Sequence, residues 1–155
     1  MDLWRLIINF KKYIVENINN PLKEMFDFFE KRTGEHIKRV EDNINVILKN
    51  VDNVDKDKLI IRGKNHDKSK YSKIEYIPYV WLTWWYKEKQ EGNKFTYPSN
   101  DIKNDIKIAG DHHVKINKHH PESHDNINDM NDIDICEMVA DWAAMSQELN
   151  DNLKN

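Results

Sequence analysis

Residues 59–70 read Leu-Ile-Ile-Arg-Gly-Lys-Asn-His-Asp-Lys-Ser-Lys, an apolar run that leads into an adjacent histidine and aspartate. Neutral imidazole and carboxylate are ligands that suit borderline divalent metals. Two adjacent side chains can serve one ion only where packing fixes the backbone between them. The two oxygens of Asp67 could also bridge two ions. His66 and Asp67 therefore predict a metal site on a firmly packed segment.

Further residues of the kinds that bind metal ions occur before and after this pair in the sequence. His36 precedes it, in a segment where Val40, Ile44 and Ile47 recur on the same side. After it come His112-His113, His119-His120, His124 and, on a later predicted helix, Asp141. An ordered series of this kind favours one site assembled from several segments. The alternative is an ordinary helical bundle with a histidine-rich surface.

Apolar residues recur at helical spacing along most of the chain. Helices are predicted at about 3–18, from Pro21 onward, from the Ser72–Glu75 capping box to about Gln90, at 99–118 and at 132–149. The second of these either breaks at Thr33-Gly34 or runs on to Leu48. Four glycines and four prolines are too few for an all-β fold, which consumes turn residues.

The length of 155 residues fits one domain. We expect an all-α fold, a single-domain bundle of five to seven helices over residues 1–155. Residues 1–32 would form N-terminal helices that pack on a metal-site core of residues 33–149.

The ligand order resembles that of the HD-domain superfamily, whose members are helical metal-dependent phosphohydrolases, with a few di-iron oxygenases among them. Residues 66–70 match its central signature of His-Asp followed, three residues on, by Lys. Residues 113–122 and 137–142 resemble more closely an uncharacterised HD-like family of bacteria and viruses (DUF5662-like), and this resemblance covers roughly Thr33 to Met145.

The resemblance implies an HD-type bundle in which a first metal ion is bound by four residues: His36, His66, Asp67 and Asp141. His113, with His119 or His120, would bind a second ion or a substrate phosphate. The ion would be manganese, iron, zinc, cobalt or nickel. The gap between His113 and the His119-His120 pair is shorter than in larger two-metal members, which leaves one or two ions open.

The same resemblance implies catalytic roles for Asp67, as ligand and base, and for Lys70, His113 and His120. On a helix through residue 118, His113, Asn117 and His120 would share one face at spacing i, i+4 and i+7, whereas His112 and His119 would share another. Residues that could orient the ligands from outside are Asn117, Glu122, Glu137 and Glu75. Glu75 also fits a capping box with Ser72.

The last predicted helix carries Asp134, Glu137 and Asp141 on one face. Three carboxylates would repel one another unless a cation or basic partner lies among them. The opposite face is expected to pack through four apolar side chains: Ile135, Met138, Val139 and Trp142.

The net charge of −3 and the interspersed acids and bases give no basic face, so nucleic acid is not an expected partner. The sequence has no run of about 20 apolar residues that would span a membrane. Met1 to Phe10 is too short and too charged for a signal peptide. We expect a cytoplasmic protein, in the host cytoplasm if viral, and a homodimer is compatible with its aromatic residues.

The leading functional hypothesis is hydrolysis of a nucleotide or other small phosphoester by metal-activated water. A small phosphorylated substrate would then be its partner. One alternative is a di-iron oxygenase of the HD type. Another is a non-catalytic, metal-stabilised nucleotide-binding module.

Overall fold

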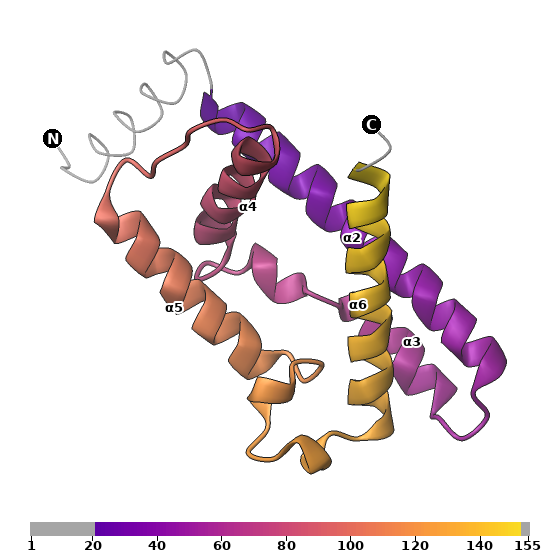
Figure 1. The fold of residues 1–155 in the computed structure, drawn as a ribbon. Coiled ribbons are helices and arrows are strands. Elements are labelled where there is room, and N and C mark those ends of the chain that lie inside the picture. The colour runs from indigo at the N-terminus through magenta and orange to yellow at the C-terminus, as the bar shows by residue number, and fades with distance from the viewer. Residues whose placement is uncertain (1–20, 153–155) are drawn as a thin grey trace, which may run out of the picture.

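The computed structural model describes residues 21–152, which form five α-helices and no strand (Figure 1). The helices are α2 (Pro21–Asn50), α3 (Lys56–Asn65), α4 (Tyr76–Gln90), α5 (Asn100–Ile116) and α6 (Asp132–Asn152), with short 3₁₀ turns at Lys68–Tyr71, Pro121–Ser123 and Ile127–Asp129. The all-α, single-domain expectation is confirmed. The helix predicted at 3–18 lies outside the described residues. None of the described helices combines the length and apolarity that crossing a membrane requires.

Helix α2 runs without a break through Thr33 and Gly34, so the longer of the two predicted helices is the one that forms. The reason is that one side of α2 stays buried over its whole length. Met25 and Phe29 pack toward α4, and Val40 and Ile44 pack toward α3 and α6. In Figure 1, α2 and α6 cross with α3 beside them, while α4 and α5 form the other side.

Two apolar clusters lie along α2. The first contains Met25, Phe29 and Val80, extended by aromatic side chains of α2 and α4 such as Phe26 and Tyr76. The second is built from Val40, Ile44, Val54, Leu59, Ala140 and Ala144. Between Phe29 and Val40 the buried residues of α2 are polar, namely Thr33 and His36. The helices therefore leave a polar layer between two apolar clusters.

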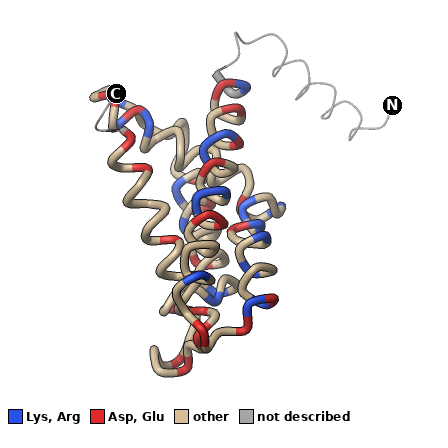
Figure 2. Tube along the Cα trace, turned by 90° about the vertical axis from the view of Figure 1, so that its right-hand side faces the viewer, with Lys and Arg blue, Asp and Glu red and all other residues tan. Residues whose placement is uncertain are grey.

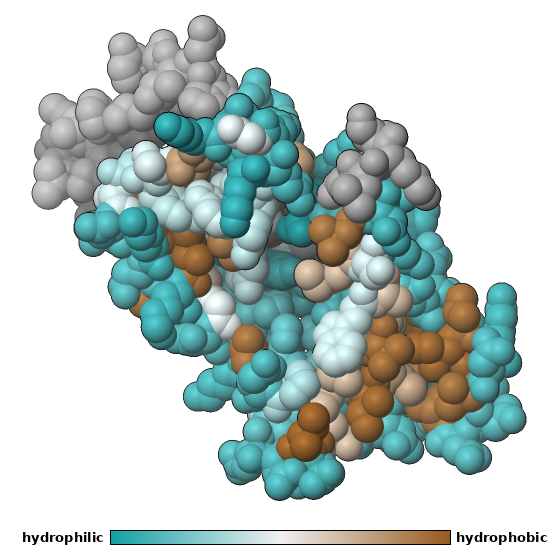
Figure 3. Space-filling view, viewed as in Figure 1, coloured by the Kyte–Doolittle hydropathy of each residue, from teal (hydrophilic) through white to brown (hydrophobic). Residues whose placement is uncertain are grey.

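The expectation that the apolar face of the last helix packs inward is wrong for three residues. Ile135, Val139 and Trp142 are 42%, 47% and 59% exposed. Helix α6 instead approaches α2 through Ala140 and Ala144, which are fully buried. Small side chains permit this close approach, and it turns the larger ones outward, so apolar atoms appear on the surface over α6 in Figure 3.

Charged residues of both signs alternate along the described helices (Figure 2). Some of them form i,i+4 pairs on one helix, namely Lys23 with Asp27, Lys87 with Glu91 and Lys107 with Asp111. Pairs of this kind on exposed faces contribute little to stability. They keep positive and negative charges interspersed on the surface. The structure thus agrees with the absence of a basic face in the sequence.

Two apolar residues of α3 test the position of the second cluster. Leu59 is fully buried and Ile61 is 57% exposed. We expect Leu59→Ala to lower the free energy of unfolding by about 2–5 kcal/mol because it leaves a cavity. Ile61→Ala should change it by less than about 0.5 kcal/mol. Urea unfolding followed by circular dichroism measures both, and equal losses would contradict the packing of α3 described above.

Candidate metal centre

Asp67 has an unusual backbone. Helix α3 ends at Asn65, His66 follows as its C-cap, and Asp67 has φ 55° and ψ 13°. It is the one non-glycine residue with positive φ among those the structure describes. This left-handed conformation costs roughly 1–2 kcal/mol for most residues, although aspartate tolerates it better. The turn that follows returns Lys70 to the Asp67 carboxylate, with Nζ 2.6 Å from Oδ2.

Four side chains from three helices and this turn converge on one point. Nε2 of His36 lies 3.3 Å from Nε2 of His66 and 3.0 Å from Oδ1 of Asp141. Oδ2 of Asp67 lies 3.8 Å from Nε2 of His36 and 3.6 Å from that of His66. Ligand atoms bound to one ion at 2.0–2.2 Å lie about 3–3.5 Å apart. The predicted first set is therefore brought together at nearly the spacing that one ion needs.

A second group lies on the other side of Asp67. Its Oδ1 is 3.2 Å from Nε2 of His113 and 3.7 Å from Nε2 of His119. Ring nitrogens of His113, His119 and His120 lie within 4.8 Å of one another. The two oxygens of Asp67 thus face two different groups of imidazoles, which is the arrangement of a bridging carboxylate.

Buried polar atoms without a hydrogen bond cluster here. They include Oδ1 of Asp67 and Nε2 of His120. A buried polar atom left without a partner costs about 1–3 kcal/mol, so folded proteins rarely tolerate several together. Their position beside nitrogen and carboxylate donors fits a cation. These buried His and Asp clusters could hold a metal ion.

Glu137 holds the imidazole of His66 by a hydrogen bond from behind and lies close to that of His119, whose Nδ1 makes no hydrogen bond among the described residues. Oε1 of Glu137 lies 3.0 Å from Nδ1 of His66 and 3.4 Å from Nδ1 of His119. Arg62 of α3 donates to Glu137 at 2.7 Å and to Asp134 at 2.9 Å. Arg62 is thus a basic partner for two of the three carboxylates on the acidic face of α6. Because Nδ1 of His66 is held in this way, Nε2 is left as the ligand atom.

Glu75 has the same role on the opposite side. Its buried carboxylate accepts hydrogen bonds from Nδ1 of His112 at 2.7 Å, Nδ1 of His113 at 2.9 Å and Oγ of Ser69 at 2.8 Å. Half of the predicted capping box forms, since the N–H of Glu75 donates to Oγ of Ser72. Burial opposes ionisation of Glu75, but the hydrogen bonds from His113, His112 and Ser69 outweigh it and lower its pKa.

The roles of Ser69 and His112 in this network were not predicted from the sequence, where their one signal is a position next to predicted residues. Asn117 joins it by donating to Oγ of Ser69 and to the carbonyl oxygen of His113. Glu122 lies apart, in a hollow that it shares with His113, His120 and Tyr79.

The prediction of a single helix face for His113, Asn117 and His120 is wrong. Helix α5 ends at Ile116, and Asn117 is its C-cap. His119 and His120 lie in the turn before Pro121, where helical spacing no longer applies. His119 is buried, with its ring centroid 4.5 Å from that of His66. Of the two histidines left open by the sequence, His119 lies nearer to Asp67 and Asp141, and both line one cavity beside the centre.

The buried charges shift several pKa values. Burial alone would lower the pKa of His66, but Asp141, Glu137 and Asp67 outweigh it and raise the value to about 9. Burial and the neighbouring His119 and His113 lower the pKa of His120 to about 4. For Asp141, burial is outweighed by hydrogen bonds from His36 and His66, which hold its pKa well below its ordinary value.

The centre opens into a cavity of about 200 Å³. Besides the residues of the centre itself, the cavity is lined by the cations Arg32 and Lys70, by Glu148, which pairs with Arg32, and by Thr33, Tyr79 and Met145. The cavity therefore joins a candidate cation site to side chains that bind anions.

The position of Glu137 beside His66 and His119 predicts that loss of its carboxylate weakens metal binding. Glu137→Gln should weaken zinc or manganese binding about 10–100-fold, because the imidazoles lose a negatively charged acceptor. Asp134→Asn is the matched control, since Asp134 contacts Arg62 but no imidazole. Isothermal titration of metal-free protein measures both. Equal weakening in the two variants would show that the Arg62 pairing, and not the imidazole contact, matters.

The pKa shifts also predict how the stability of metal-free protein depends on pH. His66 has its pKa raised to about 9, so its contribution is complete below its ordinary value of 6.5 and is lost as pH rises to about 9. For Glu137, burial is outweighed by His119, His66 and Arg62, so its pKa falls to about 2 and its contribution is lost as pH falls from 4.5 to about 2.

His120, whose pKa is lowered to about 4, binds its proton more weakly in the folded protein and so lowers stability as pH falls below 6.5. Urea unfolding in the presence of a chelator should therefore show a maximum at about pH 6.5. Bound metal competes with the proton on His66, so adding it should move the maximum to higher pH. A stability that keeps rising from pH 6.5 to 9 without metal would contradict the contacts assigned to His66.

The comparisons with known proteins bear on the family alone. No curated protein and no solved structure matches the chain. The resemblance to the wider HD-domain superfamily stays a prediction, whereas the finer resemblance, to the DUF5662 family, is confirmed. The matching model covers residues 25–155, which include every residue of the candidate metal centre. The chain belongs to the family of unknown function DUF5662.

Proposed function

We propose that this protein is a metal-dependent phosphohydrolase of the HD type that acts on a small phosphorylated substrate. The observation that carries the proposal is that two cations, Lys70 and Arg32, line the same cavity as the carboxylate and imidazole donors. The residues around Asp67 would hold one or two divalent transition-metal ions. Such ions, when bound, lower the pKa of a coordinated water and polarise a phosphoryl oxygen.

The chain itself supplies charge and hydrogen bonds around the reacting group. The side chain of Lys70 is 18% exposed, and its Nζ is held beside Asp67. A fixed ammonium in a water-poor cavity can stabilise negative charge that develops on phosphoryl oxygens. Arg32 offers a planar fork that matches phosphate geometry. Nε2 of His120 lies at the cavity without a hydrogen bond, so it can accept a proton.

The two alternative functions predict different observations. A di-iron oxygenase would use the same nitrogen and oxygen ligands, but it does not require two cations at the cavity. A binding module without catalysis would bind a phosphorylated ligand and leave it intact. The identity of the bound metal distinguishes the oxygenase from the hydrolase. Turnover of the phosphorylated ligand distinguishes the hydrolase from the binding module.

Metal content is the first test. The unsubstituted protein, as isolated, should contain one or two equivalents of a transition metal, measured by inductively coupled plasma mass spectrometry. The double variant His66→Ala/Asp67→Ala should lose it, whereas His124→Ala should keep it, because the His124 ring instead contacts the carbonyl of Lys118. No metal in the unsubstituted protein, even after reconstitution, would rule out the metal centre. Iron with a mixed-valence spectrum would favour the oxygenase.

Lys70 provides the test of phosphate chemistry. With a panel of phosphoesters, Lys70→Met should lower kcat/KM about 100-fold or more, because charge stabilisation at the phosphoryl group is lost. Lys68→Met is the matched control, since Lys68 is exposed and donates to Asn65. Equal activity in the two variants would contradict the role of Lys70. A metal-loaded protein that cleaves no ester in the panel would contradict the proposed function.

A further inference from the structure

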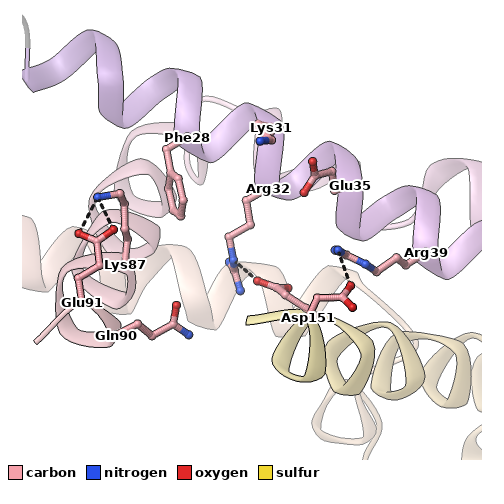
Figure 4. A pocket seen from close by; sticks show the side chains of 10 residues that line it. Phe28, Lys31, Arg32, Glu35, Arg39, Lys87, Gln90, Glu91 and Asp151 are labelled. Carbon is pink, nitrogen blue, oxygen red and sulfur yellow. Dashed lines mark hydrogen bonds and ion pairs between the residues drawn. The ribbon is translucent and has the colours of Figure 1, made fainter. Parts of the chain in front are cut away.

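Another hollow, separate from the one that Glu122 lines, adjoins the metal cavity. It has a volume of about 390 Å³ and lies between α2, the end of α4 and the end of α6 (Figure 4). Arg32 and Glu148 line both spaces, so the hollow and the metal cavity meet at this ion pair. None of the imidazoles and carboxylates of the candidate metal centre lines the hollow. A substrate with its phosphate at the metal centre would therefore have room to extend past Arg32.

Helix α2 places three of its residues in a row along this path. Phe28, Arg32 and His36 follow one another at intervals of four residues, which puts them on one side of the helix. Each interval spans about 6 Å along the axis, so Phe28 lies about 12 Å from His36 in that direction. The row leads from an aromatic ring, past a cation, to a candidate metal ligand.

The charges of the hollow are balanced. Its lining has four basic residues (Lys31, Arg32, Arg39 and Lys87) and four acidic ones (Glu35, Glu91, Glu148 and Asp151). Several are paired with each other, as Arg32 is with Glu148 at 2.6 Å and Arg39 with Asp151 at 3.4 Å. A chain of further phosphates would meet as much negative as positive charge. An uncharged group with many hydrogen-bond donors and acceptors suits this lining better.

One aromatic ring interrupts the polar lining. Phe28 points from α2 into the hollow in Figure 4, and the Gln90 side chain lies across the space from it. An edge-to-face contact with Trp84, with centroids 6.0 Å apart, fixes the ring. Trp84 is in turn covered by the ammonium of Lys87 at 4.5 Å. The Phe28 ring can stack on a flat heterocycle, and the Gln90 amide across the space can form hydrogen bonds with the edge of that heterocycle.

We propose that this hollow binds the leaving group of the substrate and that the leaving group is a nucleoside, so that the substrate is a nucleoside monophosphate. The proposal rests on the proposed phosphohydrolase function. The ribose hydroxyls would lie beside Arg32 and Glu148, and the base would lie against Phe28. A phosphate on a single pentose is too short to reach Phe28 from the metal centre. Arg32 donates to Glu148 through Nε, and its guanidinium has further N–H groups for the phosphate or the sugar.

The kinetic test compares adenosine 5′-monophosphate with ribose 5-phosphate in metal-loaded protein. The two esters share the reacting phosphate and the sugar and differ in the base. We expect kcat/KM to be about tenfold or more higher for the nucleotide, which is the usual value of stacking one base on an aromatic side chain. Phe28→Leu should bring the ratio close to one, and Phe28→Tyr should keep it. Because both substrates are measured on one preparation, partial unfolding cancels in the ratio.

Phe26→Leu is the matched control. It removes an aromatic ring from α2 two residues away, where Phe26 stacks on Tyr76 and does not line the hollow. The ratio should stay at its unsubstituted value. Arg32→Gln should lower kcat/KM for both esters, because both have the phosphate and the ribose. A ratio near one in the unsubstituted protein, or one that Phe28→Leu leaves unchanged, would overturn the nucleoside subsite and leave the hydrolase proposal intact.

A binding measurement does not depend on turnover. In saturation-transfer NMR with metal-free protein, the base protons of adenosine 5′-monophosphate should receive saturation, and Phe28→Leu should abolish it while Phe26→Leu does not. If metal-loaded protein cleaves neither ester but this signal is present, the nucleoside subsite holds and the hydrolase proposal fails. If the base protons receive no saturation in the unsubstituted protein, the subsite is overturned.

Discussion

The buried carboxylate of Asp67 is the constraint on which the rest of the structure depends. It is 2% exposed, and an isolated charge so placed would cost several kcal/mol. Lys70 and imidazoles from different segments surround this carboxylate and offset the cost of burying its charge. His36 comes from α2, His66 from the end of α3, and His113 and His119 from α5 and the turn after it. These contacts give α2, α3 and α5 fixed positions relative to one side chain.

Two further carboxylates extend this arrangement outward. Glu137 connects α6 to His66 and, through Arg62, to α3, while Glu75 connects the start of α4 to α5 through His112 and His113. Buried ion pairs of this kind add little net stability, because desolvation offsets their attraction. Their effect is geometric: they fix which ring nitrogen faces the centre. The two apolar clusters above and below supply the hydrophobic stabilisation that the polar layer does not.

Helix α2 relates the centre to the proposed substrate subsite. Its unbroken run through Thr33 and Gly34 places the candidate ligand His36 and the cation Arg32 on one rigid element. Had the helix broken at Gly34, the hollow and the metal cavity would not share a wall. The paired charges around Arg32 also limit what can bind there, since they favour a polar, uncharged group over a longer anion. In the proposed function, the same helix would position the reacting phosphate and select the group attached to it.

The sequence by itself determined the helical class, the bounds of α4 and α6 to within a few residues, and the set of residues that converge on Asp67. Periodicity and ligand order are local or serial properties, and both can be read from one chain. The end of α5 at Ile116, the left-handed Asp67, the pairing of Arg62 with Glu137 and the outward face of α6 were decided by tertiary structure. Periodicity shows that a helix has an apolar side but not which side its neighbour covers. Arg62 and Glu137 are 75 residues apart, and only the packing of α3 on α6 brings them together.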